Sequence, residues 1–205
     1  MFDALAFDQL LGTADSGSRL RWAQARRCVC FDQDGGTNPS CPVCNGNAYV
    51  WDSWSKEFRA GVLGLTGRQI ENISQRFGPA AVGDATISLP HTCPPYHTVT
   101  QRDRFVALDA TDTAEWSIVP GVILTLPFQA VLLEARVMSL DGLSIIPAPV
   151  PVADANSRIS VTQATVVRLR APRRYEVIFD LSQTRAIMPG LPRKMMLKLV
   201  DLSLR

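Results

Sequence analysis

Short segments of strand-forming residues, separated by glycine and proline, constrain the fold of this chain more than any other feature. One such segment covers residues 19–24, and nine more follow residue 48. The nine are 49–51, 58–65, 85–89, 104–108, 122–126, 131–138, 159–169, 175–181 and 195–202. Because no helical repeats lie between them, the pattern favours an antiparallel β-barrel or sandwich over a sheet of alternating strands and helices. The predicted fold class is mainly β.

Helical signals are few. Apolar residues recur with helical spacing over residues 2–12, which predicts a short N-terminal helix, and residues 68–76 allow one or two helical turns. With 205 residues, 46% of them hydrophobic, the chain is large enough for a real core, which excludes intrinsic disorder.

A proline-rich segment suggests a boundary within the chain. Pro147, Pro149 and Pro151 alternate with apolar residues, as in an extended connector. We therefore expect a helical arm over residues 1–18 and a β domain over 19–150 with a cysteine-rich loop at 28–46. A basic β part follows over 151–205, and it either stands apart or completes the same barrel.

Two close pairs of cysteines form the strongest local motif. Cys28 and Cys30 are followed, after ten intervening residues, by Cys41 and Cys44 within Cys41-Pro42-Val43-Cys44-Asn45-Gly46. A Cys-Pro-x-Cys-x-Gly turn is typical of the knuckles of zinc ribbons and rubredoxins, where thiolates converge on a metal. The loop is rich in turns and has no core of its own, so metal–sulfur bonds would order it. We predict a structural zinc site at Cys28, Cys30, Cys41 and Cys44.

Three alternatives to zinc remain open at this point. Four thiolates also suit an iron–sulfur cluster, and the same residues could form disulfides or stay unliganded. Redox catalysis through Cys41 and Cys44 is disfavoured, because a thioredoxin-type motif opens a helix after a strand.

The remaining cysteine, Cys93, lies between His91 and His97 in a proline-containing loop. This spacing invites a metal site, but a buried or bystander thiol is the favoured interpretation.

Motifs of common enzymes are missing from the sequence. It contains no Walker loop, no GxGxxG after a strand, no HExxH and no GxSxG, and its carboxylates are scattered. The four tryptophans are expected to cap the metal site rather than to stack on bases. Two interpretations remain for the basic run, a DNA-facing surface or a solvated strand; the run comprises Arg168, Arg170, Arg173 and Arg174. We expect a protein that is not an enzyme.

Charge and hydropathy limit the kinds of partner that this chain is expected to bind. Residues 158–205 carry ten Lys or Arg and three Asp or Glu, whereas residues 1–157 carry eleven and sixteen. Opposite charges on two segments favour either head-to-tail contact between copies or a basic surface facing an acidic partner. No segment has the roughly 20 unbroken apolar residues of a membrane span and the N-terminus lacks a signal-peptide pattern, so we expect a soluble protein made in a cytoplasm and no membrane partner.

The order of several motifs resembles that of the head-completion, or neck, proteins of tailed bacteriophages. The resemblance covers residues 20 to about 110. It rests on Trp22, Cys28-Val29-Cys30, Cys41-Pro42-Val43-Cys44-Asn45-Gly46, the strand Phe58–Leu65, Gly83-Asp84, Leu89-Pro90, Tyr96 and Asp103-Arg104-Phe105.

This resemblance implies a structural virion protein, assembled in the host cytoplasm, that joins the DNA-filled head to the tail. It implies a homo-oligomeric ring, a hexamer or a dodecamer, with portal or adaptor and tail proteins as partners and non-specific contact with double-stranded DNA in the channel. The cysteine loop would then serve as a metal-stapled docking element. The alternative is a zinc-ribbon nucleic-acid-binding module on a β domain.

Overall fold

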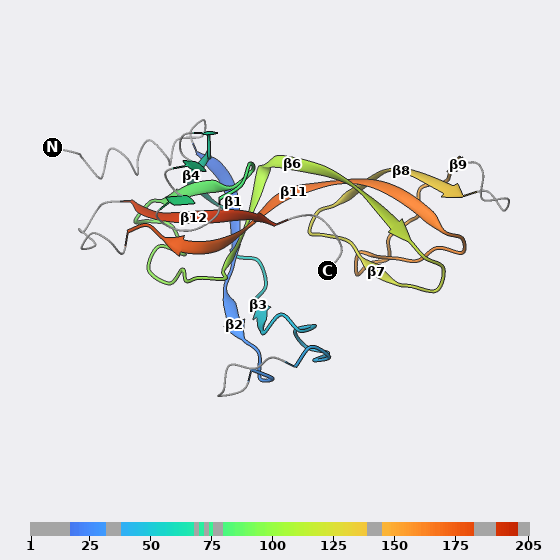
Figure 1. Cartoon of the computed structure of the whole chain (residues 1–205), viewed down its shortest axis with the longest axis horizontal. Helices are drawn as coiled ribbons and strands as arrows, with labels where there is room; N and C mark the ends of the chain where they lie inside the picture. Colours follow the sequence, from blue (N-terminus) through green and yellow to red (C-terminus); the bar gives the residue numbers. More distant parts are fainter. Residues whose placement is uncertain are drawn as a thin grey trace. The chain divides into compact units, whose positions relative to one another are not determined.

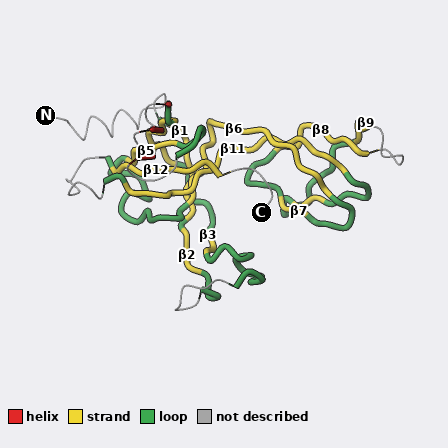
Figure 2. The backbone as a smooth tube through the Cα atoms, in the orientation of Figure 1, coloured by secondary structure: helices red, strands yellow, loops and turns green. Residues whose placement is uncertain are grey.

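The computed structural model describes residues 17–31, 38–67, 70–71, 74–75, 80–138, 145–182 and 192–200. The described chain is mainly β, as predicted (Figures 1 and 2). The helix expected over residues 2–12 lies outside the described residues. Helical backbone occurs at residues 67, 70–71 and 74–75, within and next to the segment where one or two turns were expected.

Twelve strands follow one another along the chain. They are β1 (Ser18–Ala23), β2 (Ala25–Arg27), β3 (Tyr49–Trp51), β4 (Phe58–Gly64), β5 (Ala85–Leu89), β6 (Arg104–Ile118), β7 (Leu124–Thr125), β8 (Val131–Met138), β9 (Ile145–Ala148), β10 (Arg158–Ile159), β11 (Thr165–Asp180) and β12 (Arg193–Val200).

Six of these strands close into an antiparallel barrel, which confirms the predicted fold class. Their order is β12-β5-β4-β1-β6-β11, and the pairing of β11 with β12 closes the ring. Alternate residues point inward, so Leu20, Ile87, Phe105, Val177 and Leu197 are all fully buried. The outward positions on the same strands carry polar and charged side chains.

The two longest strands extend beyond the barrel. β6 has 15 residues and β11 has 16, and the chain divides into compact units within both strands. Unit 1 comprises Met1–Leu108 and Arg174–Val200 and holds the barrel, whereas unit 2 comprises Asp109–Arg173 and Asp201–Arg205. This division differs from the boundary expected near residue 150, because strand pairing rather than the proline-rich segment decides which residues pack together.

Unit 2 has its own small core. The outer part of β11 pairs with β8, β8 pairs with β9, and β7 pairs with β10 in a separate two-stranded sheet. Trp116, Ile118, Ile159, Val167 and Leu169 are buried together between these strands. Proline does not prevent β9 from forming. Pro147 has no backbone N–H to donate, and an edge strand has a partner on one side only, so no hydrogen bond to a further strand is lost.

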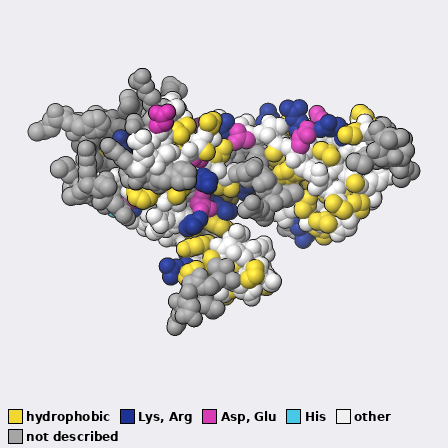
Figure 3. All heavy atoms as spheres, viewed as in Figure 1, with side chains coloured by type: hydrophobic (Ala, Val, Ile, Leu, Met, Phe, Trp, Pro, Cys, Tyr) yellow, Lys and Arg dark blue, Asp and Glu magenta, His cyan; other side chains and the backbone are white. Residues whose placement is uncertain are grey.

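Large hydrophobic side chains are exposed mainly on unit 2. Nine of the thirteen such residues in the described chain lie there: Val119, Val122, Ile123, Val131, Leu133, Ile145, Ile146, Val150 and Val152. Figure 3 shows hydrophobic side chains gathered on the surface around β7. Clustered exposed apolar side chains of this kind mark interaction surfaces.

Among the described residues, the model contains no helix with the length and apolar character needed to cross a membrane.

Candidate metal centre

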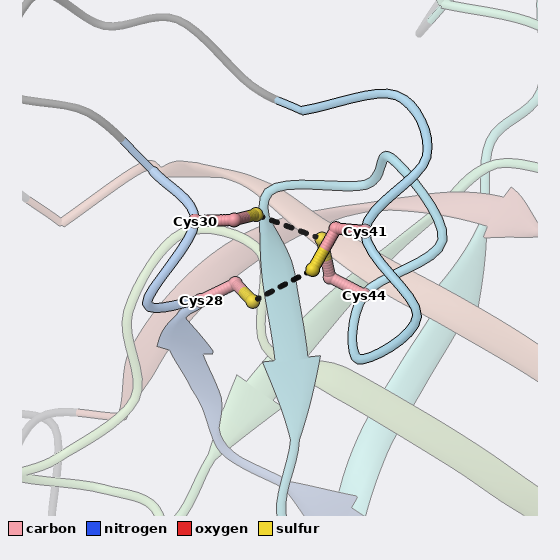
Figure 4. Close-up of side chains that lie close together, drawn as sticks. All are labelled: Cys28, Cys30, Cys41 and Cys44. Carbon is pink, nitrogen blue, oxygen red and sulfur yellow. Dashed lines mark hydrogen bonds between the residues drawn. The ribbon is translucent and has the colours of Figure 1, made fainter.

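The four predicted cysteines converge at the end of a two-stranded ribbon. β2 and β3 pair antiparallel, with Ala25 opposite Trp51 and Arg27 opposite Tyr49, and the cysteines lie on the chain between them. We call residues 25–51 the cysteine ribbon. Figure 4 shows the side chains of Cys28 and Cys30 pointing toward those of Cys41 and Cys44. All four sulfurs lie within 4.8 Å of one another, so the structure brings the predicted ligand set together.

Backbone hydrogen bonds shape both halves of the centre. Cys28 N–H donates to the Ala48 carbonyl at 2.8 Å and thereby fixes the first pair at the end of the strands. In the second half, Asn45 N–H donates to the Cys41 carbonyl at 2.8 Å. Gly46 then has a φ of +79°, and a Cβ atom there would lie 3.1 Å from the Pro39 carbonyl oxygen. The glycine of the motif is therefore needed for both its conformation and its close approach.

The sulfur geometry fits a tetrahedral cation. The Sγ atoms of Cys28 and Cys41 are 3.8 Å apart, and those of Cys30 and Cys44 are 3.4 Å apart. Four sulfurs bound to zinc at about 2.3 Å lie about 3.8 Å from each other, which matches this spacing. All four cysteines are free thiols in the structure rather than disulfides. The cluster is thus compatible with a metal site such as a zinc site.

The electrostatic surroundings of the thiols differ. Amide hydrogen bonds from Cys44 and Val43 lower the pKa of Cys41 to about 6, because N–H dipoles stabilise its thiolate. The hydrogen bond with the Cys44 side chain, followed by burial, raises the pKa of Cys30 to about 12. A cation between the sulfurs would favour the thiolate form of all four.

A buried carboxylate joins the foot of the cysteine ribbon to the barrel. Asp103 is 0% exposed. Its Oδ2 accepts hydrogen bonds from the Trp22 indole at 2.8 Å and the Thr100 amide at 3.0 Å. Its Oδ1 accepts from the Ala25 amide at 2.8 Å and the Thr100 hydroxyl at 3.1 Å. Four donors therefore converge on this one side chain at the junction of β1 and β2.

Arginines secure the second strand of the ribbon. The guanidinium of Arg104 lies 3.4 Å from the centre of the Trp51 ring, and Trp51 Nε1–H donates to the Arg102 carbonyl at 2.8 Å. Arg102 and Arg104 both pair with Glu176, at 2.9 Å and 3.6 Å. These contacts and Asp103 fix the ribbon where it leaves the barrel.

The far end of the ribbon presents two exposed valines. Val29 lies between Cys28 and Cys30 and is 94% exposed, and Val43 lies between Pro42 and Cys44 and is 60% exposed. We call Val29 and Val43 the apolar tip. Val29 has a predicted metal ligand on both sides and Val43 has one at its C-terminal side, so a metal bound there would also hold the apolar tip. The spacing of the cysteines predicted the metal ligands, but no feature of the sequence predicted that these two valines form an exposed tip.

The tryptophans do not cap the centre as expected. Among the described residues, Val50 and Cys30 are the partly buried hydrophobic residues that pack on Cys28, Cys41 and Cys44. Trp22 and Trp51 instead hold the foot of the ribbon, and Trp116 lies in the core of unit 2. Their role follows from long-range hydrogen bonds that sequence spacing does not reveal.

The His91, Cys93 and His97 loop has a different arrangement from a metal site. The imidazole rings lie 5.1 Å apart between centroids, and Tyr96 packs against both. Cys93 is buried, in keeping with the bystander interpretation, whereas both histidines are exposed. In the part of the chain that the structure describes, only the four ribbon cysteines form a group with metal-ligand geometry.

The arginines of β11 belong to two different units. Arg168 and Arg170 are exposed on unit 2, where Arg168 lies 4.0 Å from Glu134, and Arg173 pairs with Asp112 at 2.8 Å. Arg174 belongs to unit 1. The run of basic residues in the sequence is therefore divided by the structure and interleaved with acids.

Comparison with known proteins gave no relative: no protein-family model matches this sequence, and no curated protein matches it significantly.

Proposed function

We propose that this chain is a structural subunit of a tailed-phage neck, in which copies form a ring that joins the head to the tail. The cysteine ribbon acts in this assembly as a docking element ordered by a zinc ion. The protein works by forming contacts, and no catalytic step is part of the proposal.

The observation that carries the proposal is the cysteine ribbon with its apolar tip. A loop without a core is ordered by four convergent thiols, is fastened to the barrel through Asp103, and exposes Val29 and Val43 at its end. Two exposed valines held by a rigid centre are suited to insertion into an apolar site on a neighbouring protein.

Unit 2 supplies a second surface of a different kind. Its exposed hydrophobic residues include Ile123 and Val152, which line a cavity of about 370 Å³ together with Ile159 and the Asp154–Arg158 ion pair. A chain with two unlike contact surfaces can bind head to tail, and such heterologous contacts form a ring where the rotation between neighbours closes.

Zinc is the metal we propose for the cysteine site. Four sulfurs at tetrahedral spacing and a structural role both suit zinc, which has no redox chemistry of its own. When bound, the ion would be held by Cys28, Cys30, Cys41 and Cys44 and would stabilise the folded loop.

Native mass spectrometry of the full chain tests both parts of the proposal. We expect one zinc ion per chain and a closed ring of six or twelve copies, either alone or after addition of portal or tail proteins. A monomer that stays a monomer with those proteins would overturn the neck proposal. An iron–sulfur cluster or a disulfide in place of zinc would overturn the metal assignment alone.

The second candidate is a zinc-ribbon module that binds nucleic acid. Arg26 and Arg27 favour it, since both are exposed on β2 beside the cysteines. Arg26 pairs with Asp52 at 2.8 Å, however, and Arg27 stacks on Phe31 at 5.0 Å. This candidate predicts that a monomer binds DNA through the ribbon, so that Arg27→Gln weakens binding.

A further inference from the structure

The outer part of β6 forms an open edge of the sheet in unit 2. β6 lies between β1 and β11 in the strand order, but its register with β1 ends at Ala107. Beyond this point β11 is the only strand that neighbours β6 in the described chain, and no backbone hydrogen bond from another described segment reaches residues 110–116. We call residues 110–116 the open edge. Alternate residues along it have N–H and C=O groups that no neighbouring strand pairs.

The opposite edge of the same sheet is protected. β9 is the last strand there, has four residues and contains Pro147, which has no N–H to offer. Natural proteins often protect edge strands in this way, by shortness and by proline. The open edge, in contrast, has no proline, glycine or lysine, so it keeps a regular backbone that another strand can join. Of these two edges, the one on β6 is therefore suited to strand addition.

The side chains of the open edge suit a pairing based on backbone hydrogen bonds. Exposed and half-buried residues alternate along most of it, and the exposed ones are Thr111, Thr113 and Glu115. Threonine is β-branched and favours strands. Two of the half-buried residues are the small Ala110 and Ala114. None of the exposed large hydrophobic residues of the described chain lies on this edge, so strand pairing rather than apolar burial would carry a contact here.

We propose that the open edge pairs with the same edge of a second copy of this chain, antiparallel and across a twofold axis at Thr113. A twofold contact is self-complementary, so a single edge serves both copies. In this arrangement Thr113 lies opposite Thr113 of the partner subunit. Two residues away, Thr111 lies opposite the partner's Glu115, and this pair occurs twice in the dimer.

The positions of the acids favour this register. With the axis at Thr113, Asp112 faces an alanine and Glu115 faces a threonine, so no acid opposes another acid. An axis at Asp112 would place two carboxylates directly opposite each other, which destabilises strand pairing. An axis at Ala114 would set the Asp112 carboxylate opposite Trp116, whose side chain lies in the core of unit 2. Threonines directly opposite each other are, in contrast, a favourable cross-strand pair.

This inference goes beyond the proposed function and does not rest on it. The twofold contact uses the open edge of β6, whereas the proposed ring contact uses the apolar tip of the cysteine ribbon. The double variant Val29→Asp with Val43→Asp changes the tip and leaves β6 as it is. Dimerisation is therefore measured in this background as well as in the wild type, so that ring formation and edge pairing are observed separately.

The test is sedimentation equilibrium of the full-length chain over a range of concentrations, with lysine placed at two positions of the open edge. Thr111→Lys sets a lysine opposite the partner's Glu115 twice in each dimer, so we expect the dimer dissociation constant to fall about two- to thirtyfold. Thr113→Lys sets two lysines opposite each other, so the dissociation constant should rise by up to about fivefold. Thr162→Lys adds the same charge at an exposed position of unit 2 outside the strands and should change it less than about twofold.

Hydrogen exchange supplies a second measurement on the unmodified chain. A higher protein concentration should slow the exchange of amides in residues 110–116 and leave those of β9 unchanged. A chain that stays monomeric at about 1 mM would overturn the inference. So would a dimer that responds equally to lysine at Thr111, Thr113 and Thr162, or that protects β9 instead, because the contact would then lie elsewhere. The ring proposal would survive each of these results, since it depends on the apolar tip.

Discussion

The Trp22 indole donates a hydrogen bond to the buried carboxylate of Asp103 over 2.8 Å, and this contact joins the strand that leads into the cysteine ribbon to the barrel. The backbone of Asp103 takes part as well, because its carbonyl accepts from Val177 N–H at 2.8 Å. One residue thus connects β1, β2 and β11, and the position of the ribbon depends on it.

Asp103→Asn tests this connection. The amide keeps the shape of the side chain but turns one acceptor into a donor, facing groups that themselves donate. We expect a loss of about 2–4 kcal/mol in the free energy of unfolding, measured by urea titration with tryptophan fluorescence. Asp52→Asn breaks the exposed pair with Arg26 and should cost less than about 1 kcal/mol. Similar losses in both variants would contradict the proposed role of Asp103.

Replacing a metal ligand should affect the ribbon and spare the barrel. Cys44→Ser removes one of the four sulfurs, so we expect loss of bound zinc and of ordered amide signals for residues 28–31 and 38–48 in NMR spectra. Barrel signals should persist, because the core around Phe105 does not involve the metal. Cys93→Ser, which alters a buried thiol elsewhere, should leave zinc content unchanged. A Cys44→Ser protein that retains zinc and assembles normally would refute the structural role of the centre.

The apolar tip should matter for assembly and not for folding. Val29→Asp with Val43→Asp places charges where the ring proposal expects an apolar contact, so ring formation should be lost while zinc stays bound. Val82, which is 89% exposed in another loop, offers the matched control Val82→Asp. Analytical ultracentrifugation with zinc analysis distinguishes these outcomes. Intact rings in the tip variant would show that the tip is not a subunit contact.

Three glycines allow backbone strain to be separated from steric crowding. Gly83 has a φ of +99°, and a Cβ there would lie 2.8 Å from Leu199 Cδ2. Gly121 has a φ of +80° with open space around it, and Gly64 has neither constraint. Alanine should cost about 1–2 kcal/mol at Gly121, somewhat more at Gly83, and little or nothing beyond β-propensity at Gly64. Thermal unfolding of the three variants checks this order, and a reversed order would contradict it.

Asp154 should contribute a pH-dependent part of the stability of unit 2. The amide of Arg158 lowers the pKa of Asp154, since it donates to Oδ1 at 2.8 Å, and the Arg158 guanidinium adds a bond at 2.9 Å. A lowered pKa means that the carboxylate stabilises the fold above about pH 4 and loses this effect as the pH falls through the folded-state value. Melting temperatures of wild type and Asp154→Asn should differ at pH 6, and the difference should shrink as the pH falls through the lowered pKa of Asp154 in the folded state. A difference that does not shrink on acidification would contradict this.

Many of the strands were predictable from the sequence, because they are short and bounded by turn residues. The predicted segments 49–51, 85–89 and 131–138 match β3, β5 and β8 in both bounds. The extensions of β6 and β11 were not foreseen. The predicted strand at 104–108 ends where β6 continues to Ile118, and the predicted segments 159–169 and 175–181 leave a gap that β11 spans. Pairing with neighbouring strands continues both strands. Such pairing is a tertiary effect that local propensity does not contain.

The candidate site likewise has residues that the sequence predicted and residues that it did not. The four cysteines were predictable, since ligand spacing is a local property of the chain. Asp103 and Asp84 were noticed only as parts of a motif string, although both are buried and hold distant amides: Asp84 Oδ1 accepts from Leu199 N–H at 2.9 Å.

The pairing of β12 with β5 has a consequence for synthesis on the ribosome. Leu89 lies opposite Arg193, so the barrel cannot close until nearly the whole chain has emerged. Until β12 has been synthesised, one edge of the sheet formed by β1, β4 and β5 has no partner strand. Residues 109–173 of unit 2 are contiguous in sequence and are synthesised earlier than β12. We therefore expect vectorial folding in which the inserted unit forms first and the barrel forms last and slowly.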